Sequence, residues 1–444
     1  MKISKAIVCT VVIAIIVISA FSATAQARIS LLENGRLYVY GSSTVYPISE
    51  AAKPGFEQHV RTLSTPFTST TVLLNDLGSG YGFNALTGNG MPISTDIAAS
   101  SKPGTDSGLF GPNFNNSPVG DPQEFLIGYD SIAIIVPDTN TWLSKATSRQ
   151  VADLFRSVSN SGTGASSAPM YATWGEWANV YGVTLPVGVA NQPIERIGRE
   201  ISSGTFDAFN TFFLKPNGYE MSFQATGTFA GKTTSGSGAS QAESNWLPAN
   251  YQGLTTNADV EMALQNGLHP YAIGFIGLGF VQSDLVTHPH HIIPLSLVNP
   301  QGVAVVPSVA NVKDERYVND QNTPIIRGLW YFMDSIPSAT NPEAVKSLWI
   351  SYVRAHPEFL SQNGYITTNL IDFAGTPSGN TGSTGTKSIP DGKVNFTDLL
   401  YFTSGWAAYA GPNRVLNPYL DLNADGKIDF RDLLLFTSNW AASQ

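Results

Sequence analysis

The 444-residue sequence contains a single cysteine, Cys9, which lies near the N-terminus. Without a second cysteine the chain forms no internal disulfide, and no cysteine remains further along for thiol chemistry or lipid attachment. Charged residues make up only 13% of the chain, and its net charge is -9. Nucleic acid and anionic membrane surfaces are poor partners for an acidic chain, so neither is expected.

Long apolar runs are missing after the N-terminus. Lys2 and Lys5 precede the uncharged run 6–21, and Ala25-Gln26-Ala27 follows it. This order is typical of a secretory signal spanning residues 1–27, with an uncleaved membrane anchor as the alternative. Cleavage removes the two lysines and takes the net charge to -11. We therefore expect a secreted protein, extracellular or associated with the cell surface.

Between residues 28 and 373 short apolar runs alternate with helix-like segments, which is the α/β pattern. The clearest strands are IGYDSIAIIVP and YAIGFIGLGFV, and the clearest helices are SRQVADLFRSV, GTFDAFNTFFL and NADVEMALQNG. Residues 374–386, AGTPSGNTGSTGT, predict a flexible linker. Beyond the linker, DGKVNFTDLLYFTSGW recurs as DGKIDFRDLLLFTSNW 34 residues later. This repeat predicts a separate module over residues 387–444.

Three segments place hydroxyl groups where a helix is expected to start. They are GSSTVYPI at 41–48, Gly78-Ser79-Gly80, and Ser203-Gly204-Thr205, which follows Arg199. Ser and Thr commonly cap the free N–H groups of a helix start, but the same N–H groups can also bind a small anion. Three such starts and an arginine, whose guanidinium pairs well with oxyanions, favour an anion site.

Asp96, in STDIAASSKP, is a carboxylate expected near that anion site. A carboxylate suits an anion that carries a proton, because it accepts the hydrogen bond of that proton. Phosphate carries one near neutral pH and sulfate does not, so such a group would select phosphate. The alternative reading makes Asp96 a helix cap or a partner of Lys102.

Read together, GSSTVYPI, GSG, TDIAASSKP, DSIAIIVP, SRQVADLF, REISSGT, YAIGFIGLGFV and NGYI resemble the phosphate-binding protein of the high-affinity phosphate ABC transporter. The resemblance covers 28–373 and implies an α/β, two-lobed periplasmic-binding-protein fold with a hinge. Lobe 1 would comprise 28–130 and 285–373, and lobe 2 would comprise 131–284. The implied ligand is one inorganic phosphate, the implied partner is an ABC permease in the membrane, and no reaction is implied.

The resemblance also implies a set of phosphate contacts. From lobe 1 they are Thr44, the backbone of Val45, Ser79 and, as proton acceptor, Asp96; from lobe 2 they are Arg199, Ser203, Gly204 and Thr205. Some family members carry an acid two residues after the arginine, where this chain has Ile201. That departure leaves the orientation of Arg199 open.

The second half of the repeat has the spacing of an EF-hand calcium loop. Side-chain oxygens stand at loop positions 1, 3, 5, 9 and 12, glycine at 6 and a backbone carbonyl at 7, which gives the ligand set Asp421, Asn423, Asp425, Lys427, Asp429 and Asp432. The module resembles a dockerin, a small all-α calcium-binding domain, and the implied partner is a cohesin-bearing surface or scaffold protein. The first loop departs from this pattern at Lys387 and Ile389. The alternative is a calcium-stabilised cap on the same chain, with no partner.

The sequence thus predicts an extracellular solute-binding protein rather than an enzyme. One alternative is a secreted phosphate-ester hydrolase, although residues 28–373 contain neither a Gly-x-Ser-x-Gly nor a His-Glu-x-x-His motif. The other is a phosphate-binding surface or scaffold protein that is not coupled to transport.

Overall fold

The computed structural model describes most of the chain beyond the N-terminal segment. The described residues are 35–63, 70–87, 94–102, 123–157, 168–200, 203–218, 228–229, 232–233, 248, 250–265, 267–287, 292–334, 343–368, 370 and 394–443. The expected secretion signal, the linker and positions 1 to 7 of the first calcium loop lie outside them. Within the described ranges no helix combines the length and apolar character needed to cross a membrane.

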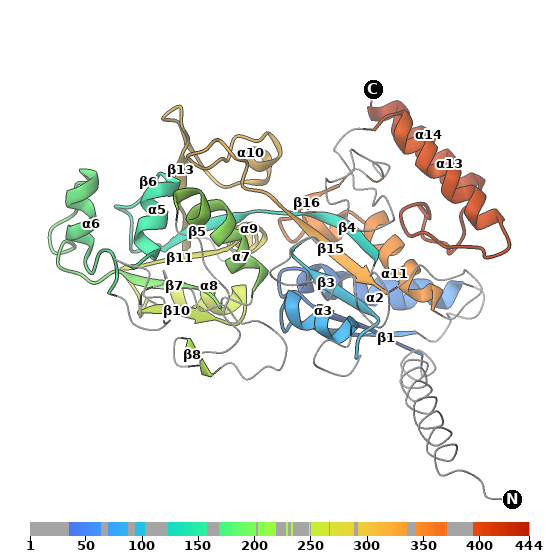
Figure 1. Ribbon diagram of the computed structural model, residues 1–444, viewed down its shortest axis with the longest axis horizontal. Coiled ribbons are helices and arrows are strands. Elements are labelled where there is room, and N and C mark those ends of the chain that lie inside the picture. The colour runs from blue at the N-terminus through green and yellow to red at the C-terminus, as the bar shows by residue number, and fades with distance from the viewer. Residues whose placement is uncertain are drawn as a thin grey trace, which may run out of the picture.

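A six-stranded sheet forms the first lobe, with strand order β16-β4-β15-β3-β1-β2 (Figure 1). Its strands are β1 (Arg36–Gly41), β2 (Thr71–Asn75), β3 (Ile97–Ser100), β4 (Gln123–Asp130), β15 (Arg327–Met333) and β16 (Ile366–Thr367). Its helices are α2 (Tyr46–Thr62), α3 (Ser79–Thr87), α11 (Ala344–Ala355) and α12 (Glu358–Ser361). Strand β1 pairs in parallel with β2 and β3, so the carboxyl ends of these three strands lie along one edge.

A five-stranded sheet forms the second lobe, with strand order β10-β7-β11-β5-β12, and a three-stranded sheet β14-β13-β6 lies beside it. The strands are β5 (Ile132–Pro137), β6 (Lys145–Ala146), β7 (Glu195–Arg199), β10 (Tyr251–Leu254), β11 (Ala272–Gly277), β12 (Ile292–Pro294), β13 (Ser296–Val298) and β14 (Ala304–Val305). The short strands β8 (Thr228–Phe229) and β9 (Lys232–Thr233) pair with each other.

The helices expected after residues 148, 204 and 257 are confirmed. The helical segments of this lobe are α5 (Ser148–Phe155), α6 (Trp174–Tyr181), α7 (Gly204–Phe209), the π-helix η1 (Asn210–Leu214), the 3-10 helix η2 (Lys215–Asn217), α8 (Asn257–Gln265), α9 (Leu278–Thr287) and α10 (Val309–Lys313). The run YAIGFIGLGFV is a strand only to Gly277, because α9 begins at Leu278.

The chain passes between the two lobes at two neighbouring points. Strand β4 ends at Asp130 and β5 begins at Ile132, while the return leads into β15 at Arg327. The hydroxyl of Ser131 donates a hydrogen bond to the carbonyl of Ile325, which ties the two passages together. Residues 292–325, expected in lobe 1, instead belong to the second lobe. They include β12, which pairs with β5, β13, which pairs with β6 and β14, and helix α10. Their buried apolar side chains fill the core of the second lobe.

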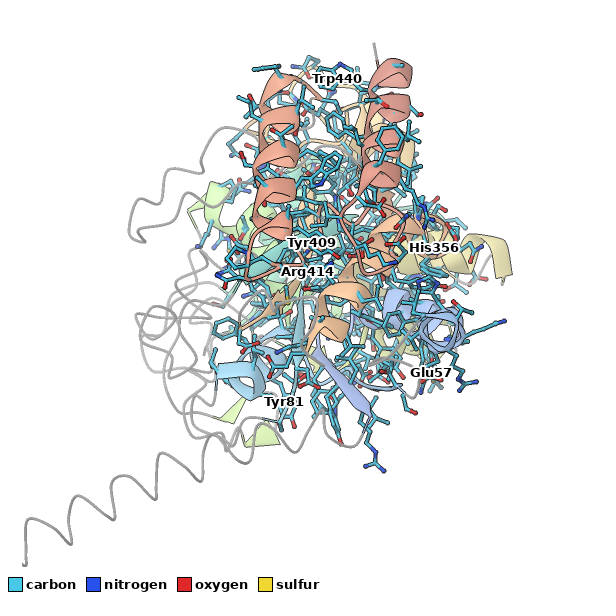
Figure 2. The ribbon with its side chains drawn as sticks, turned by 90° about the vertical axis from the view of Figure 1, so that its right-hand side faces the viewer. Glu57, Tyr81, His356, Tyr409, Arg414 and Trp440 are labelled. Atoms are coloured by element: carbon cyan, nitrogen blue, oxygen red, sulfur yellow. The ribbon has the colours of Figure 1, made fainter. Side chains whose placement is uncertain are left out.

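The C-terminal module consists of two helices, α13 (Phe396–Ala410) and α14 (Phe430–Ser443), in its described residues 394–443. Figure 2 shows them side by side, with Tyr409 and Arg414 at one end of the pair and Trp440 at the other. A separate module is expected from the sequence, but its buried apolar side chains belong to the same hydrophobic cluster as those of the first lobe. A pair of helices is too small to enclose a core of its own, so the module shares one.

Candidate functional site

Hydroxyl groups converge at the carboxyl edge of the first sheet. Ser42, Ser43 and Thr44 follow β1, Ser101 follows β3, and Ser79 begins α3 after β2. Parallel pairing brings these strand ends to one edge, which is where ligands bind in open α/β sheets.

The hydroxyls that follow β1 do not cap α2. The residue before the helix is Val45, which makes no side-chain cap, and its amide donates to the carbonyl of Ser42 at 3.1 Å. The Ser42 hydroxyl donates to Ser101 Oγ at 3.3 Å, and the Ser101 amide donates to Ser79 Oγ at 3.2 Å. These groups therefore form a network across the edge of the sheet.

The start of α7 brings the second lobe against this network. Ser203 Oγ caps the helix by accepting from the amide of Phe206 at 3.0 Å. Thr205 Oγ1 lies 3.3 Å from Thr44 Oγ1 of the first lobe. At Gly204 a Cβ atom would stand 1.9 Å from Ser101 Oγ, so only glycine permits this approach. The two lobes are thus in contact at the predicted site.

Arg199, the last residue of β7, reaches across to the first lobe. Its side chain is 1% exposed and donates to Ser43 Oγ at 2.9 Å, Thr205 Oγ1 at 3.5 Å and the Leu254 carbonyl at 3.2 Å. Burial lowers the pKa of the guanidinium to about 10, so it remains charged at neutral pH. Among the described residues, only hydroxyl and carbonyl oxygens accept from it, and no carboxylate does.

A second arginine at the site was missed in the sequence. Arg327 Nη2 lies 2.6 Å from Asp130 Oδ2 and donates to Thr44 Oγ1 and Thr205 Oγ1, both at 3.3 Å. Arg327 Nη1 and Asp130 Oδ1 are buried and have no partner among the described groups. The one feature of the sequence that could have indicated it is an arginine at the start of the apolar run RGLWYFM, in a chain with few charged residues.

We call Ser42, Ser43, Thr44, Ser79, Ser101, Asp130, Arg199, Thr205 and Arg327 the inter-lobe cluster. It contains two guanidinium groups and one carboxylate, and the rest are hydroxyls. Lys102 forms an ion pair beside it with Asp207 of α7, at 3.0 Å between the two lobes. Tyr365, from the motif NGYI, donates to the Thr44 carbonyl at 2.7 Å and holds that loop. The arrangement suits a small oxyanion, which would balance the excess positive charge.

The structure does not bring Asp96 to the cluster, which overturns its expected role as direct proton acceptor. Asp96 precedes β3, and its carboxylate accepts from the amide of Tyr38 in β1 at 2.9 Å. Ser101 follows the same strand, five residues on and roughly 16 Å away along it. Burial raises the pKa of the Asp96 carboxyl to about 6. The sequence placed Asp96 beside the site because it lies in the right motif, but at the opposite end of the strand.

The predicted calcium loop connects the two C-terminal helices. Asp421 and Asp432 are buried, and Gly426 has the left-handed backbone (φ +77°) that the turn requires. Burial and repulsion from Asp432 and Asp425 raise the pKa of the Asp421 carboxyl well above its ordinary value. Asp432 accepts from the amides of Leu422 and Asp429, each at 2.8 Å, and so closes the loop.

This donor set fits a hard cation such as calcium, because it consists of oxygens and carries excess negative charge. Within the described residues, however, no three His, Cys, Asp or Glu side chains converge as metal ligands. The loop would complete its set with Asn423 and the Lys427 carbonyl. In the first half, Asn395 and Asp398 form a capping box at the start of α13, and Asp429 and Asp432 make the same contacts in the second half.

Comparison with a protein-family profile supports the fold. The profile of a protein family described as "PBP superfamily domain" matches residues 32–333. No curated protein matches the chain. Among solved structures, a putative phosphate ABC transporter substrate-binding protein with bound phosphate from Clostridium perfringens is 16% identical, over 75% of this chain and 99% of that one, with a TM-score of 0.46. An ABC-type phosphate transport receptor from Vibrio cholerae is 18% identical, over 75% and 99%, with a TM-score of 0.45.

Proposed function

The chain belongs to the PBP superfamily, and from this premise we propose that it binds inorganic phosphate between its two lobes and delivers it to an ABC permease. The main support comes from the environment of Arg199. This arginine is buried at the lobe interface, and all its described acceptors are uncharged. A buried charge without an ionic partner is unfavourable, and a bound oxyanion would compensate it.

The second arginine strengthens this proposal. Arg327 is paired with Asp130, but its Nη1 is buried without a described partner and is free to donate to an anion. Serine and threonine hydroxyls from both lobes surround the two arginines and donate or accept as the ligand requires. A ligand that needs donors from both lobes favours the closed state, because its full set of contacts exists only there.

In this proposal Asp130, rather than Asp96, discriminates phosphate from sulfate. Asp130 is the carboxylate of the inter-lobe cluster, and its buried Oδ1 has no described partner. That oxygen would accept the hydrogen bond of a protonated phosphate, whereas sulfate would leave two acceptors facing each other.

The test is titration calorimetry on protein freed of ligand by unfolding and refolding. We expect one phosphate per chain and no heat with sulfate at the same concentration. Absence of phosphate binding would refute the proposal. Steady hydrolysis of a chromogenic phosphomonoester would favour the hydrolase. Phosphate binding without stimulation of uptake by a permease of the same cell would favour a surface protein not coupled to transport.

For the C-terminal module we propose calcium at the second loop and a cohesin-like partner. Phe396 and Phe430 occupy equivalent positions of the repeat, as do Leu400 and Leu434, and all four are at least half exposed. This repeated apolar face suits a protein partner. A pull-down from a surface extract of the producing cell, with and without chelator, tests it. A retained protein that is lost with chelator supports the partner, and no retained protein favours the cap.

A further inference from the structure

The segment between the two C-terminal helices lies against the first lobe. Tyr419 is 2% exposed, and its hydroxyl accepts from the amide of Leu126 in β4 at 2.7 Å. Its ring packs on Phe125 of the same strand, with centroids 5.3 Å apart. The guanidinium of Arg354, from α11, stands 4.1 Å above the ring. One tyrosine of the module is therefore inserted between a strand and a helix of the first lobe.

Two further contacts join the same parts. The hydroxyl of Ser351 in α11 donates to the Pro418 carbonyl at 3.3 Å. His59 Nε2 in α2 lies 2.5 Å from the carbonyl of Ala424. Ala424 has a left-handed backbone (φ +56°) and is the fourth residue of the predicted calcium loop. The first lobe thus contacts the loop itself as well as the segment that precedes it.

Docking residues and predicted calcium ligands alternate along the chain. Leu420, Leu422 and Ala424 are buried in the hydrophobic cluster of the first lobe. Asp421 and Asn423 stand between them as predicted ligands at positions 1 and 3. A cation that fixes one set of side chains therefore also fixes the other, because they share one short stretch of backbone.

We propose that the C-terminal helix pair is a built-in brace of the first lobe, and that calcium at its second loop tightens this brace, so that calcium stabilises the phosphate-binding lobe. This inference rests on the calcium site proposed above. The segment around Tyr419 contacts the first lobe, whereas Phe396 and Phe430 are exposed and remain available to a partner.

The test is hydrogen exchange on the full chain, in calcium chloride and in the chelator EGTA, with calcium binding measured separately by calorimetry. We expect calcium to slow exchange at least tenfold in β4 and α11 of the first lobe. Peptides from β5 and α5 of the second lobe are the internal control and should change little.

Two matched variants test whether the contact of Tyr419 with β4 couples calcium binding to the first lobe. Tyr419→Phe removes the hydroxyl that reaches Leu126, whereas Tyr409→Phe removes one that contacts Arg414 within the module. Both should still bind calcium, and Tyr419→Phe should show the smaller protection of the first lobe. Because Phe keeps the ring in place, this variant is expected to fold.

Three outcomes separate the proposals. Calcium binding with protection of the first lobe that weakens in Tyr419→Phe supports the brace. Calcium binding that protects only the module overturns the brace and leaves the calcium site standing. Absence of calcium binding overturns both, without bearing on phosphate.

Discussion

Asp130 and Arg327 form a buried ion pair, 2.6 Å between Oδ2 and Nη2, at the two points where the chain passes between its lobes. Asp130 ends β4 just before one passage, and Arg327 begins β15 just after the other. The pair therefore belongs to the inter-lobe cluster that we propose as the anion site, and it lies beside both connections between the lobes.

Replacing Asp130 by Asn should leave the charge of Arg327 uncompensated. Breaking a buried ion pair typically costs about 3–5 kcal/mol, so we expect a lower melting temperature without ligand. Added phosphate should raise the melting temperature of Asp130→Asn more than that of the wild type, because the anion then replaces the missing charge. Calorimetry should show weaker exclusion of sulfate, since an amide can donate as well as accept. A variant with unchanged selectivity would contradict the role given to Asp130.

Arg199→Lys should weaken phosphate binding with the fold intact. Lysine keeps the charge but loses the planar fork that reaches Ser43 and Thr205 together. One lost charged hydrogen bond corresponds to about 1.5–3 kcal/mol, or roughly 10- to 150-fold in the dissociation constant. Arg196→Lys is the control, because Arg196 is equally buried on β7 but donates to main-chain carbonyls of the second lobe. It should lower stability and leave phosphate affinity near that of the wild type.

Gly204→Ala should hinder closure. The added Cβ would meet Ser101 Oγ at 1.9 Å, and these residues belong to different lobes. The clash exists only when the lobes meet, so unfolding without phosphate should change little while binding weakens by about 1–3 kcal/mol. The double variant Gly204→Ala with Ser101→Gly removes the clashing side chain and should recover part of the affinity. No recovery would show that the approach of Gly204 to Ser101 does not limit closure.

Asp96→Asn should stabilise the protein at neutral pH and leave anion selectivity unchanged. Burial raises the pKa of Asp96 from 3.8 to about 6, so the folded state holds the proton more tightly than the unfolded state. This group's contribution to stability therefore falls as the pH rises from about 4 to about 6, and is constant above that range. Asparagine does not ionise, so the free energy of unfolding of Asp96→Asn should exceed that of the wild type by an amount that grows over the same pH range to about 2–3 kcal/mol. Urea unfolding of both proteins at pH 4.5, 5.5 and 7 checks this; an advantage that does not vary with pH contradicts it.

The full chain should bind one calcium ion rather than two. In the first loop, Lys387 and Ile389 stand at positions 1 and 3 and supply no carboxylate or amide oxygen there. The second loop has Asp421 and Asn423 at these positions, and Asp421 is buried. Calcium titration should give a stoichiometry near one, and Asp421→Ala should abolish it, whereas Asp398→Ala should leave it unchanged. A stoichiometry of two would place a working site in the first loop.

The sequence alone determined the local structure of the site. Alternation of apolar runs with amphipathic segments identified the α/β class, and the helices starting near Ser148, Gly204 and Asn257 form as expected. The hydroxyl-rich helix starts and Arg199 were predicted from local patterns, and the family resemblance singled out Thr44, Ser79 and Thr205 within them. The structure brings these residues together. These features depend on a few neighbouring residues, which is why local patterns reveal them.

Only the tertiary structure decided which distant groups join them. Arg327 reaches Thr44 from 283 residues away, through the pairing of β15 into the first sheet, and no local pattern encodes that pairing. Asp96 and Ser101 lie in one motif, yet only strand direction determines that Ser101 faces the site and Asp96 does not. The C-terminal repeat predicted a separate module and left open whether it caps the rest of the chain, because sequence periodicity describes each helix but not the surface that its apolar side chains will cover. Such contacts depend on the relative position of whole elements, and that position is fixed by the packing of the entire core.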